Sequence, residues 1–99
     1  MFDAQSPARA TLDMAITRSE FARQLKAAFP GLQESAPDAF SGEDVGCQWS
    51  IRLHPTAPTR LGLIVLERWL ADVALEAPAP AQRQLWWQRF SGHFQKGGG

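Results

Sequence analysis

The chain has 99 residues, equal numbers of acidic and basic side chains, and therefore a formal net charge of zero. This length fits one domain that can bury a core without help from a metal or a disulfide, and four Trp and six Phe supply much of its apolar surface. The charge balance argues against a protein that binds by neutralising phosphates, because such domains carry a basic excess.

The single cysteine, Cys47, cannot form an internal disulfide, and the sequence shows no signal peptide, lipidation motif or apolar run of membrane-spanning length. We therefore expect a cytoplasmic protein with no membrane partner. Arg52, Arg60 and Arg68 could line one face of a sheet, but no RNA-binding signature accompanies them. A nucleic-acid partner is not expected.

Residues 1–15 are predicted to be a flexible N-terminal extension, because no clean hydrophobic period is apparent in them, and the removal of residues 1–13 is expected to leave the fold intact. The folded domain is predicted to span residues 16–96. Residues 97–99, three consecutive glycines, are predicted to form a flexible tail.

A capping box predicts the first helix. The hydroxyl of Thr17 is placed to accept from the amide of Glu20, whose carboxylate is placed to accept from the amide of Thr17. The helix is predicted over residues 17–29, with Phe21 and Leu25 on its buried face, and Pro30 follows its end.

Residues 30–44 are rich in Pro, Gly, Ser and acids, a composition that favours a loop. Residues 45–54 then alternate between apolar and polar side chains, which predicts a half-buried strand with Cys47 as a small core residue. Residues 55–59 contain two prolines and are predicted to be a rigid connector.

The most apolar part of the chain, residues 61–75, fits two interpretations, one helical face or two alternating strands. Its β-branched and apolar character on both parities favours strands over residues 60–66 and 69–76, with a tight turn at Glu67 and Arg68. Together with the strand before them, these predict a three-stranded antiparallel meander.

A second helix is predicted over residues 80–95, with Leu85, Trp86, Phe90 and Phe94 on one stripe and Trp87 at its edge. The predicted fold is therefore two-layer α+β, in the order helix-strand-strand-strand-helix. Both helices are expected to pack on the sheet face that carries Trp49, Val65 and Val73.

No catalytic constellation is apparent. His54 lies on the opposite strand parity from Cys47, and His93 lies on the second helix, so neither is placed to activate the thiol. One Cys and two separated His match no metal-ligand spacing, and no phosphate-binding loop is present. We expect no enzyme activity, no metal and no cofactor.

With Leu61, Leu63 and Val65 predicted to point at the helices, the predicted sheet leaves an apolar patch on the opposite face. Small monomers seldom expose such a patch, so we expect a homodimer interface or a docking surface for a partner protein, unless one helix crosses to cover it. The predicted partner-binding residues are Ile64, Leu66, Leu70, Arg52 and Arg68.

The sequence thus favours a small non-enzymatic interaction module: an adaptor, a chaperone-like protein or a regulatory subunit. An alternative is a carrier activated at its C-terminal glycine carboxylate, because Gly98 and Gly99 resemble the Gly-Gly tail of ubiquitin-like carriers. In those carriers the tail follows a strand of a β-grasp fold, whereas here it follows a predicted helix. A helix stop is the favoured interpretation of the glycines.

Overall fold

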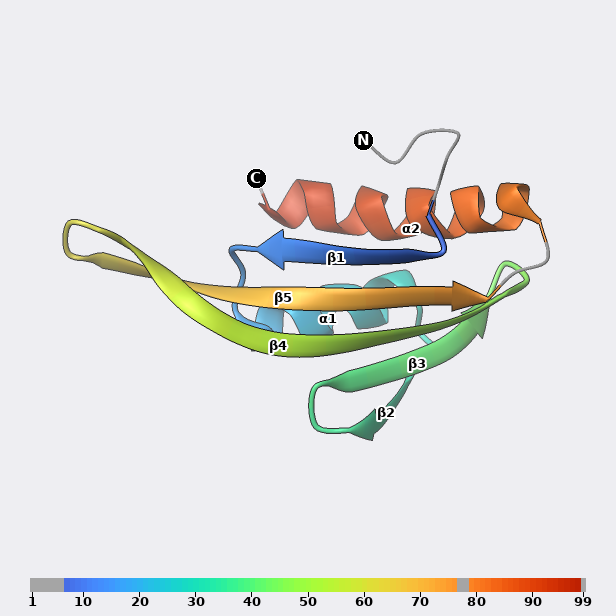
Figure 1. Cartoon of the computed structure of the whole chain (residues 1–99), viewed down its shortest axis with the longest axis horizontal. Helices are drawn as coiled ribbons and strands as arrows, with labels where there is room; N and C mark the ends of the chain where they lie inside the picture. The colour runs from blue at the N-terminus through green and yellow to red at the C-terminus, as the bar shows by residue number, and fades with distance from the viewer. Residues whose placement is uncertain (1–6, 77–78, 99) are drawn as a thin grey trace.

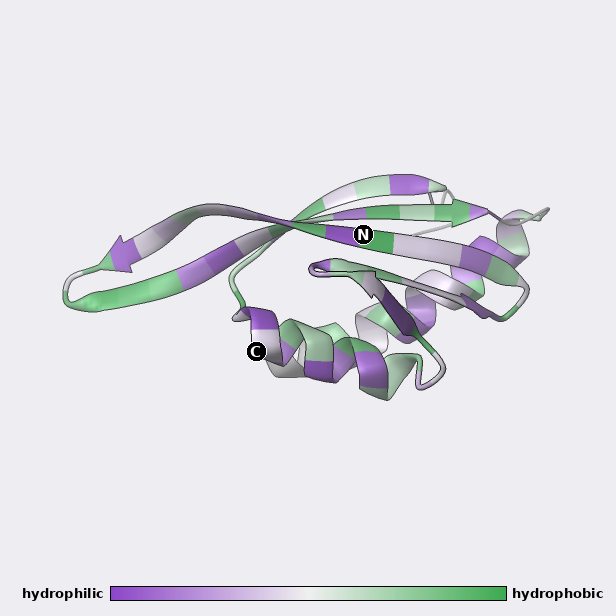
Figure 2. Ribbon diagram, turned by 90° about the horizontal axis from the view of Figure 1, so that it is seen from below, coloured by the Kyte–Doolittle hydropathy of each residue, from purple (hydrophilic) through white to green (hydrophobic). Residues whose placement is uncertain are grey.

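The computed structural model describes residues 7–76 and 79–98, with side chains described as far as Phe94. Five antiparallel strands form one sheet in the order β1-β5-β4-β3-β2 (Figure 1). Both helices lie on the same side of this sheet (Figure 2). The elements are β1 (Arg9–Met14), α1 (Arg18–Ala28), β2 (Gln33–Ala36), β3 (Ala39–Asp44), β4 (Cys47–Leu61), β5 (Ile64–Glu76) and α2 (Pro80–Gly98).

The α+β class is confirmed, but the predicted order of elements is wrong. The chain runs strand-helix-strand-strand-strand-strand-helix. The predicted three-stranded meander is also wrong, because its residues form only two strands, β4 and β5, with β3 and β2 on one side of them and β1 on the other. No helix in the described ranges is long and apolar enough to cross a membrane.

Residues 9–14 form β1, an edge strand, where the sequence predicted a flexible extension. β1 pairs with β5 from Arg9 opposite Ala74 to Met14 opposite Trp69. Its inward side chains, Ala10, Leu12 and Met14, are half-buried and alternate with polar side chains in the sequence, a short strand period that the sequence prediction missed. The indole Nε1 of Trp87 donates to the carbonyl of Pro7 at 2.8 Å and ties the start of β1 to α2.

The predicted start of α1 is confirmed. The Thr17 hydroxyl accepts from the amide of Glu20 at 3.1 Å, which caps the helix. The carboxylate of Glu20 does not complete the reciprocal half of the capping box, because it accepts instead from Arg23 and from Gln24.

Residues 33–44, predicted as loop, form the hairpin of β2 and β3 around a two-residue turn. Asp38 in that turn has a φ of 66°, a left-handed conformation that Asp tolerates better than most residues. The guanidinium of Arg18 pairs with the carboxylates of Asp38 and Glu34 and fastens this hairpin to the start of α1. β2 is short and wholly exposed, so no apolar alternation marks it in the sequence.

β4 and β5 form one long hairpin, which corrects the predicted turn at Glu67 and Arg68. The turn lies at Gly62 and Leu63, between the paired residues Leu61 and Ile64. Gly62 has a φ of 62° at the first central position, the pattern of a type II′ turn that suits the twist of a hairpin.

The predicted connector 55–59 lies inside β4 because its prolines do not interrupt the ladder with β5. Leu53 donates its N–H to Asp38, away from β5, and alternation directs residue 55 the same way. Pro55 therefore lacks only an N–H that would have faced solvent, and Pro58 lies in the bulge between Thr56 and Thr59.

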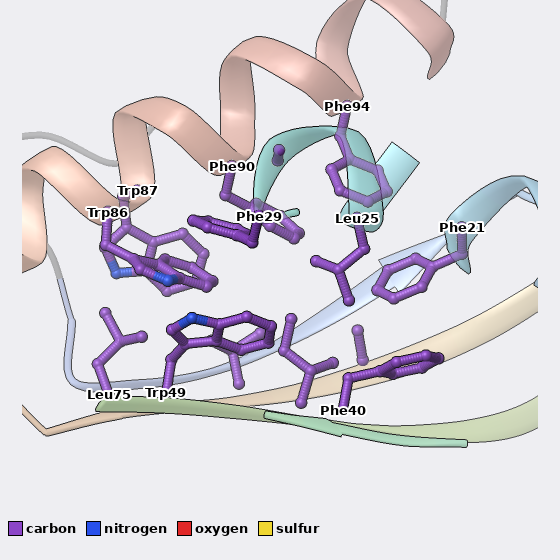
Figure 3. Packing of buried hydrophobic residues seen from close by; sticks show 14 of the residues in the cluster. Phe21, Leu25, Phe29, Phe40, Trp49, Leu75, Trp86, Trp87, Phe90 and Phe94 are labelled. Carbon is purple, nitrogen blue, oxygen red and sulfur yellow. The ribbon is translucent and has the colours of Figure 1, made fainter. Parts of the chain in front are cut away.

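Stacked aromatic rings join the two helices in the core (Figure 3). Trp86 of α2 stacks on Phe29 at the end of α1 and on Phe90 of α2, with ring centroids 5.0 and 5.3 Å apart. Trp49 of β4 packs against Phe29 at 4.9 Å. Cys47 is fully buried as predicted, whereas Leu85, predicted on the buried stripe of α2, is exposed.

Removing residues 1–13, which takes away all of β1 except Met14, should destabilise the protein, contrary to the expectation from sequence. The deletion uncovers the edge of β5 and the partly buried side chains that β1 lays on the core, so we expect a loss of about 3 kcal/mol or more in unfolding free energy. Urea unfolding measures it. Leu12→Ala, which keeps the β1 backbone, should cost roughly 1 kcal/mol. Unchanged stability of the truncated chain would show that β1 is dispensable.

Gly42 should resist substitution because a Cβ there would lie 2.8 Å from the ring of Trp49. We expect Gly42→Ala to cost about 1 to 3 kcal/mol through overpacking. Gly31→Ala is the matched control, since no atom lies within 4 Å of its Cβ position. Thermal unfolding compares the two, and equal midpoints would contradict the close packing of Trp49 on β3.

Candidate interaction surface

The hairpin of β4 and β5 extends beyond the rest of the sheet. Toward the turn of this hairpin, the pairing of β3 with β4 stops at Ala39 and Arg52, and the pairing of β1 with β5 stops at Met14 and Trp69. Residues 55–68, which we call the arm, therefore form a two-stranded ribbon with no neighbouring strand on either edge among the residues that the structure describes. Figures 1 and 2 show the arm leaving the body of the molecule, with its tip clear of both helices.

The tip of the arm is apolar and exposed. Leu63 in the turn is fully exposed, and Ile64 and Val65 remain more than half exposed. Cross-strand pairing places Leu61 beside Ile64 on one face of the ribbon and Arg60 beside Val65 on the other. The side chains that the sequence predicted to point at the helices, those of Leu61, Leu63 and Val65, instead lie beyond the helices and contact no core residue.

Two charged residues fasten the base of the arm. The guanidinium of Arg68 donates to the carboxylate of Asp13 on β1 at 2.7 Å and to the hydroxyl of Thr59 across the arm at 2.9 Å. One carboxylate oxygen of Glu67 accepts from the backbone N–H of Arg18 at 3.0 Å and from the indole of Trp69 at 2.6 Å.

Glu67 thus contacts one of the free N–H groups at the start of α1, where a negative charge is favoured by the helix dipole. The hydrogen bond from Trp69 and then that from the Arg18 backbone hold the pKa of Glu67 below its ordinary value of 4.5. Glu67 therefore contributes stability above pH 4.5, and this contribution is lost as the pH falls through the lowered pKa.

The five predicted partner-binding residues lie on one face of the sheet, the face opposite the helices. Alternation along β5 puts Ile64, Leu66, Arg68 and Leu70 on the same side, and pairing of Arg52 with Asp72 places Arg52 there too. Ile64 and Leu66 are exposed on the arm, Leu70 is half-buried at its base, and Arg52 is exposed on the body. Arg68 is half-buried by its bonds to Asp13 and Thr59.

The body part of this open face is polar. Asp72 accepts from the hydroxyl of Thr11 at 2.8 Å and lies 2.9 Å from Nε2 of His54. The carboxylate separates the hydroxyl from the imidazole, so His54 is not placed to take the proton of Thr11. Two shallow hollows of about 560 and 340 Å³ share Ser41, Ser50 and Ala74 as floor.

Cys47 is fully buried in the core. Burial raises the pKa of its thiol, opposed in part by the charge of Arg83, so the nucleophilic thiolate is disfavoured. His54 and His93 do not approach it, and the described residues hold no group of three His, Cys, Asp or Glu side chains that could bind a metal.

The C-terminal glycines fall partly outside the described residues. α2 continues through Gly98, and Gly99 lies outside the described range. The thin extended tail that a carrier needs is therefore not seen up to Gly98.

Scans against protein-family models, curated proteins and solved structures found no match to this chain. The apolar tip of the arm and the polar face of the body are the two surfaces that the fold leaves accessible on the side away from its helices.

The sequence prediction missed Leu61, Leu63 and Val65 as surface residues and Glu67 and Trp69 as the base of the arm. One signal was available, since Gly62 is the one glycine within the run and glycine readily takes the positive φ that the first central position of a type II′ hairpin turn requires. The contact of Glu67 with Arg18 spans 49 residues and follows only from the tertiary fold.

Glu67→Gln should lower the thermal midpoint at about pH 7, because the amide keeps its shape but loses the charge at the start of α1. The difference from the unchanged protein should shrink as the pH falls below 4.5 and disappear once the pH lies below the lowered pKa of Glu67, where the carboxyl is protonated in both the folded and the unfolded state. Glu43→Gln is the control, as that exposed carboxylate has no partner among the described residues. A pH-independent difference would mean that charge plays no part.

Proposed function

We propose that this protein is a small non-enzymatic interaction module, an adaptor, chaperone-like protein or regulatory subunit, that docks through its arm. One observation carries the proposal. Six large hydrophobic side chains are exposed among the described residues, and five of them gather at the tip of the arm: Leu61, Leu63, Ile64, Val65 and Leu66.

Such a concentration differs from the scattered apolar residues of an ordinary surface, which need no explanation. The buried rings and aliphatic side chains of the core pack against one another without any residue of the tip, so the tip residues are not part of the core. The exposure of these side chains to water is unfavourable, and their burial against a partner is favourable.

The base of the arm supports the same function. Arg68 and Glu67 bind β1 and the start of α1, so the ribbon is held in one direction before any partner arrives. A preorganised surface loses less conformational entropy on binding than a free loop does. The tip combines aliphatic side chains with Arg60 at its margin, and interfaces are often apolar in the centre and polar at the rim.

The non-enzymatic part of the proposal is supported by the chemistry of the described residues. The one thiol is buried, the hydroxyl of Thr11 is directed at a carboxylate, and the hollows of the open face are open to solvent. None of these arrangements pairs a nucleophile with a base.

A photo-crosslinking amino acid at position 64 should give adducts with protein in cells of the source organism. The same group at Leu85, an exposed apolar residue on α2, is the control and should give few adducts. Mass spectrometry identifies the adducts.

Ile64→Lys with Leu66→Lys should abolish adducts formed from a crosslinker at Leu63, and Leu85→Lys should not. Circular dichroism checks that both variants fold, which we expect because the side chains are exposed. A crosslinker at position 64 that captures no protein at all, its own chain included, would overturn the proposed function.

A further inference from the structure

The two edges of the arm differ in what they offer to a neighbouring strand. Leu75 donates its N–H to the carbonyl of Ala8, so the odd-numbered residues of β5 direct their backbone groups toward the β1 side. Along the arm this side has no strand, because β1 ends opposite Trp69. Val65 and Glu67 therefore present two N–H and two C=O groups to an open edge.

The other edge, that of β4, is poorly suited to pairing. Pro55 has no N–H to offer on that side, and Pro58 lies in a bulge that interrupts the regular spacing. Prolines and bulges are devices by which proteins protect exposed edges. On the β5 edge, residues 64–68 contain neither a proline nor a bulge, and three consecutive side chains, from Ile64 to Leu66, are aliphatic.

We propose that a second copy of this chain docks on the β5 edge of the arm, with residues 64–68 of the two copies paired as antiparallel strands about Leu66. The inference rests on the proposed function, since it names the occupant of the same surface. A twofold axis through Leu66 places Val65 of one copy opposite Glu67 of the other, and the reverse. Each of these pairs exchanges two hydrogen bonds, so the four free backbone groups of each arm all find partners.

The side chains suit this register. Leu66 meets Leu66 of the second copy in a close, non-hydrogen-bonded pair, and Ile64 lies opposite Arg68. No two like charges are directly opposed. A shift of the axis to Glu67 would oppose two carboxylates, and a shift to Val65 would require residue 63, which belongs to the turn.

Charges on the other face of the ribbon are complementary as well. Arg60, which has no partner among the described residues, lies beside Val65 in the row that Glu67 of the second copy would join. The two positions are two strand spacings apart, roughly 10 Å, so the long side chain of Arg60 can approach the second carboxylate oxygen of Glu67, the one that Arg18 and Trp69 do not engage.

The difference between the edges also sets the size of the assembly. Only one edge of each arm can extend the ladder, so pairing ends at two copies with an isologous interface. Two competent edges would instead allow strands to add without limit.

Leu66→Lys and Leu66→Glu test both the occupant and the register. Sedimentation should give twice the chain mass of 10.9 kDa for the unchanged protein and for Leu85→Lys. Each Leu66 variant alone should be monomeric, because two like charges would face each other. An equimolar mixture should recover the dimer, since Lys then faces Glu.

Val65→Pro tests the backbone pairing separately. It removes an N–H that faces the open edge and leaves the ladder with β4 intact, so the chain should fold, as amide spectra of the body would verify. We expect the dimer dissociation constant to rise by about tenfold or more, from two hydrogen bonds lost per dimer. Val65→Thr keeps the N–H and should retain the dimer.

A monomeric unchanged protein would overturn the inference, as would Leu66 variants that stay dimeric or a mixture that stays monomeric. A monomer that crosslinks from position 64 to a different protein would overturn the inference and leave the proposed function standing. A monomer that crosslinks to nothing and sediments with anionic phospholipid vesicles would overturn both.

Discussion

The stack of Phe29, Trp86 and Phe90 is the interaction on which the architecture depends. It joins the end of α1 to the middle of α2, and Trp49 beneath it joins both helices to the central strand β4. Because all large rings of the core gather on one face of the sheet, both helices lie there, and none of the described elements remains to cover the other face. The opposite face of the body is therefore built from polar and small side chains, as its residues Arg52, Asp72 and Ser50 illustrate.

The arm does not have one buried and one open face, because it extends past the layer of helices. Along the body, one parity of β5 is buried and the other is polar, whereas along the tip both parities are aliphatic although neither is covered. A strand that is apolar on both faces is typical of a position between two layers. In a monomer the tip has neither layer, and this mismatch between side chains and surroundings is what links the fold to an interaction.

Most of the buried elements could be predicted from sequence, since α1, α2 and the alternating strand at Cys47 bury a regular face whose period is visible in the residues. The strands that escaped prediction have little to bury: β2 is exposed throughout, and β1 packs at an edge. The run from Leu61 was predicted as two strands with a turn at Glu67 and Arg68, but after the turn at Gly62 and Leu63 it forms one continuous strand, β5. Glu67 and Arg68 are instead engaged with α1 and β1, contacts between distant parts of the chain that no local pattern records.

Part of the candidate surface could be predicted from sequence, again where a local period indicates which way a side chain points. Ile64 and Leu66 were expected on the outer face from parity alone, which depends only on the two-residue period of a strand. The exposure of Val65 and Leu61 depends on how far the helices reach, and that length is a tertiary property. The anchoring of the arm follows from it: because Glu67 contacts the start of α1 and Arg68 contacts β1, any force on the tip is transmitted directly to two elements of the body. The charged residues between the apolar runs therefore fix the direction of the arm, and the direction of the arm decides where a docked protein can lie relative to the body.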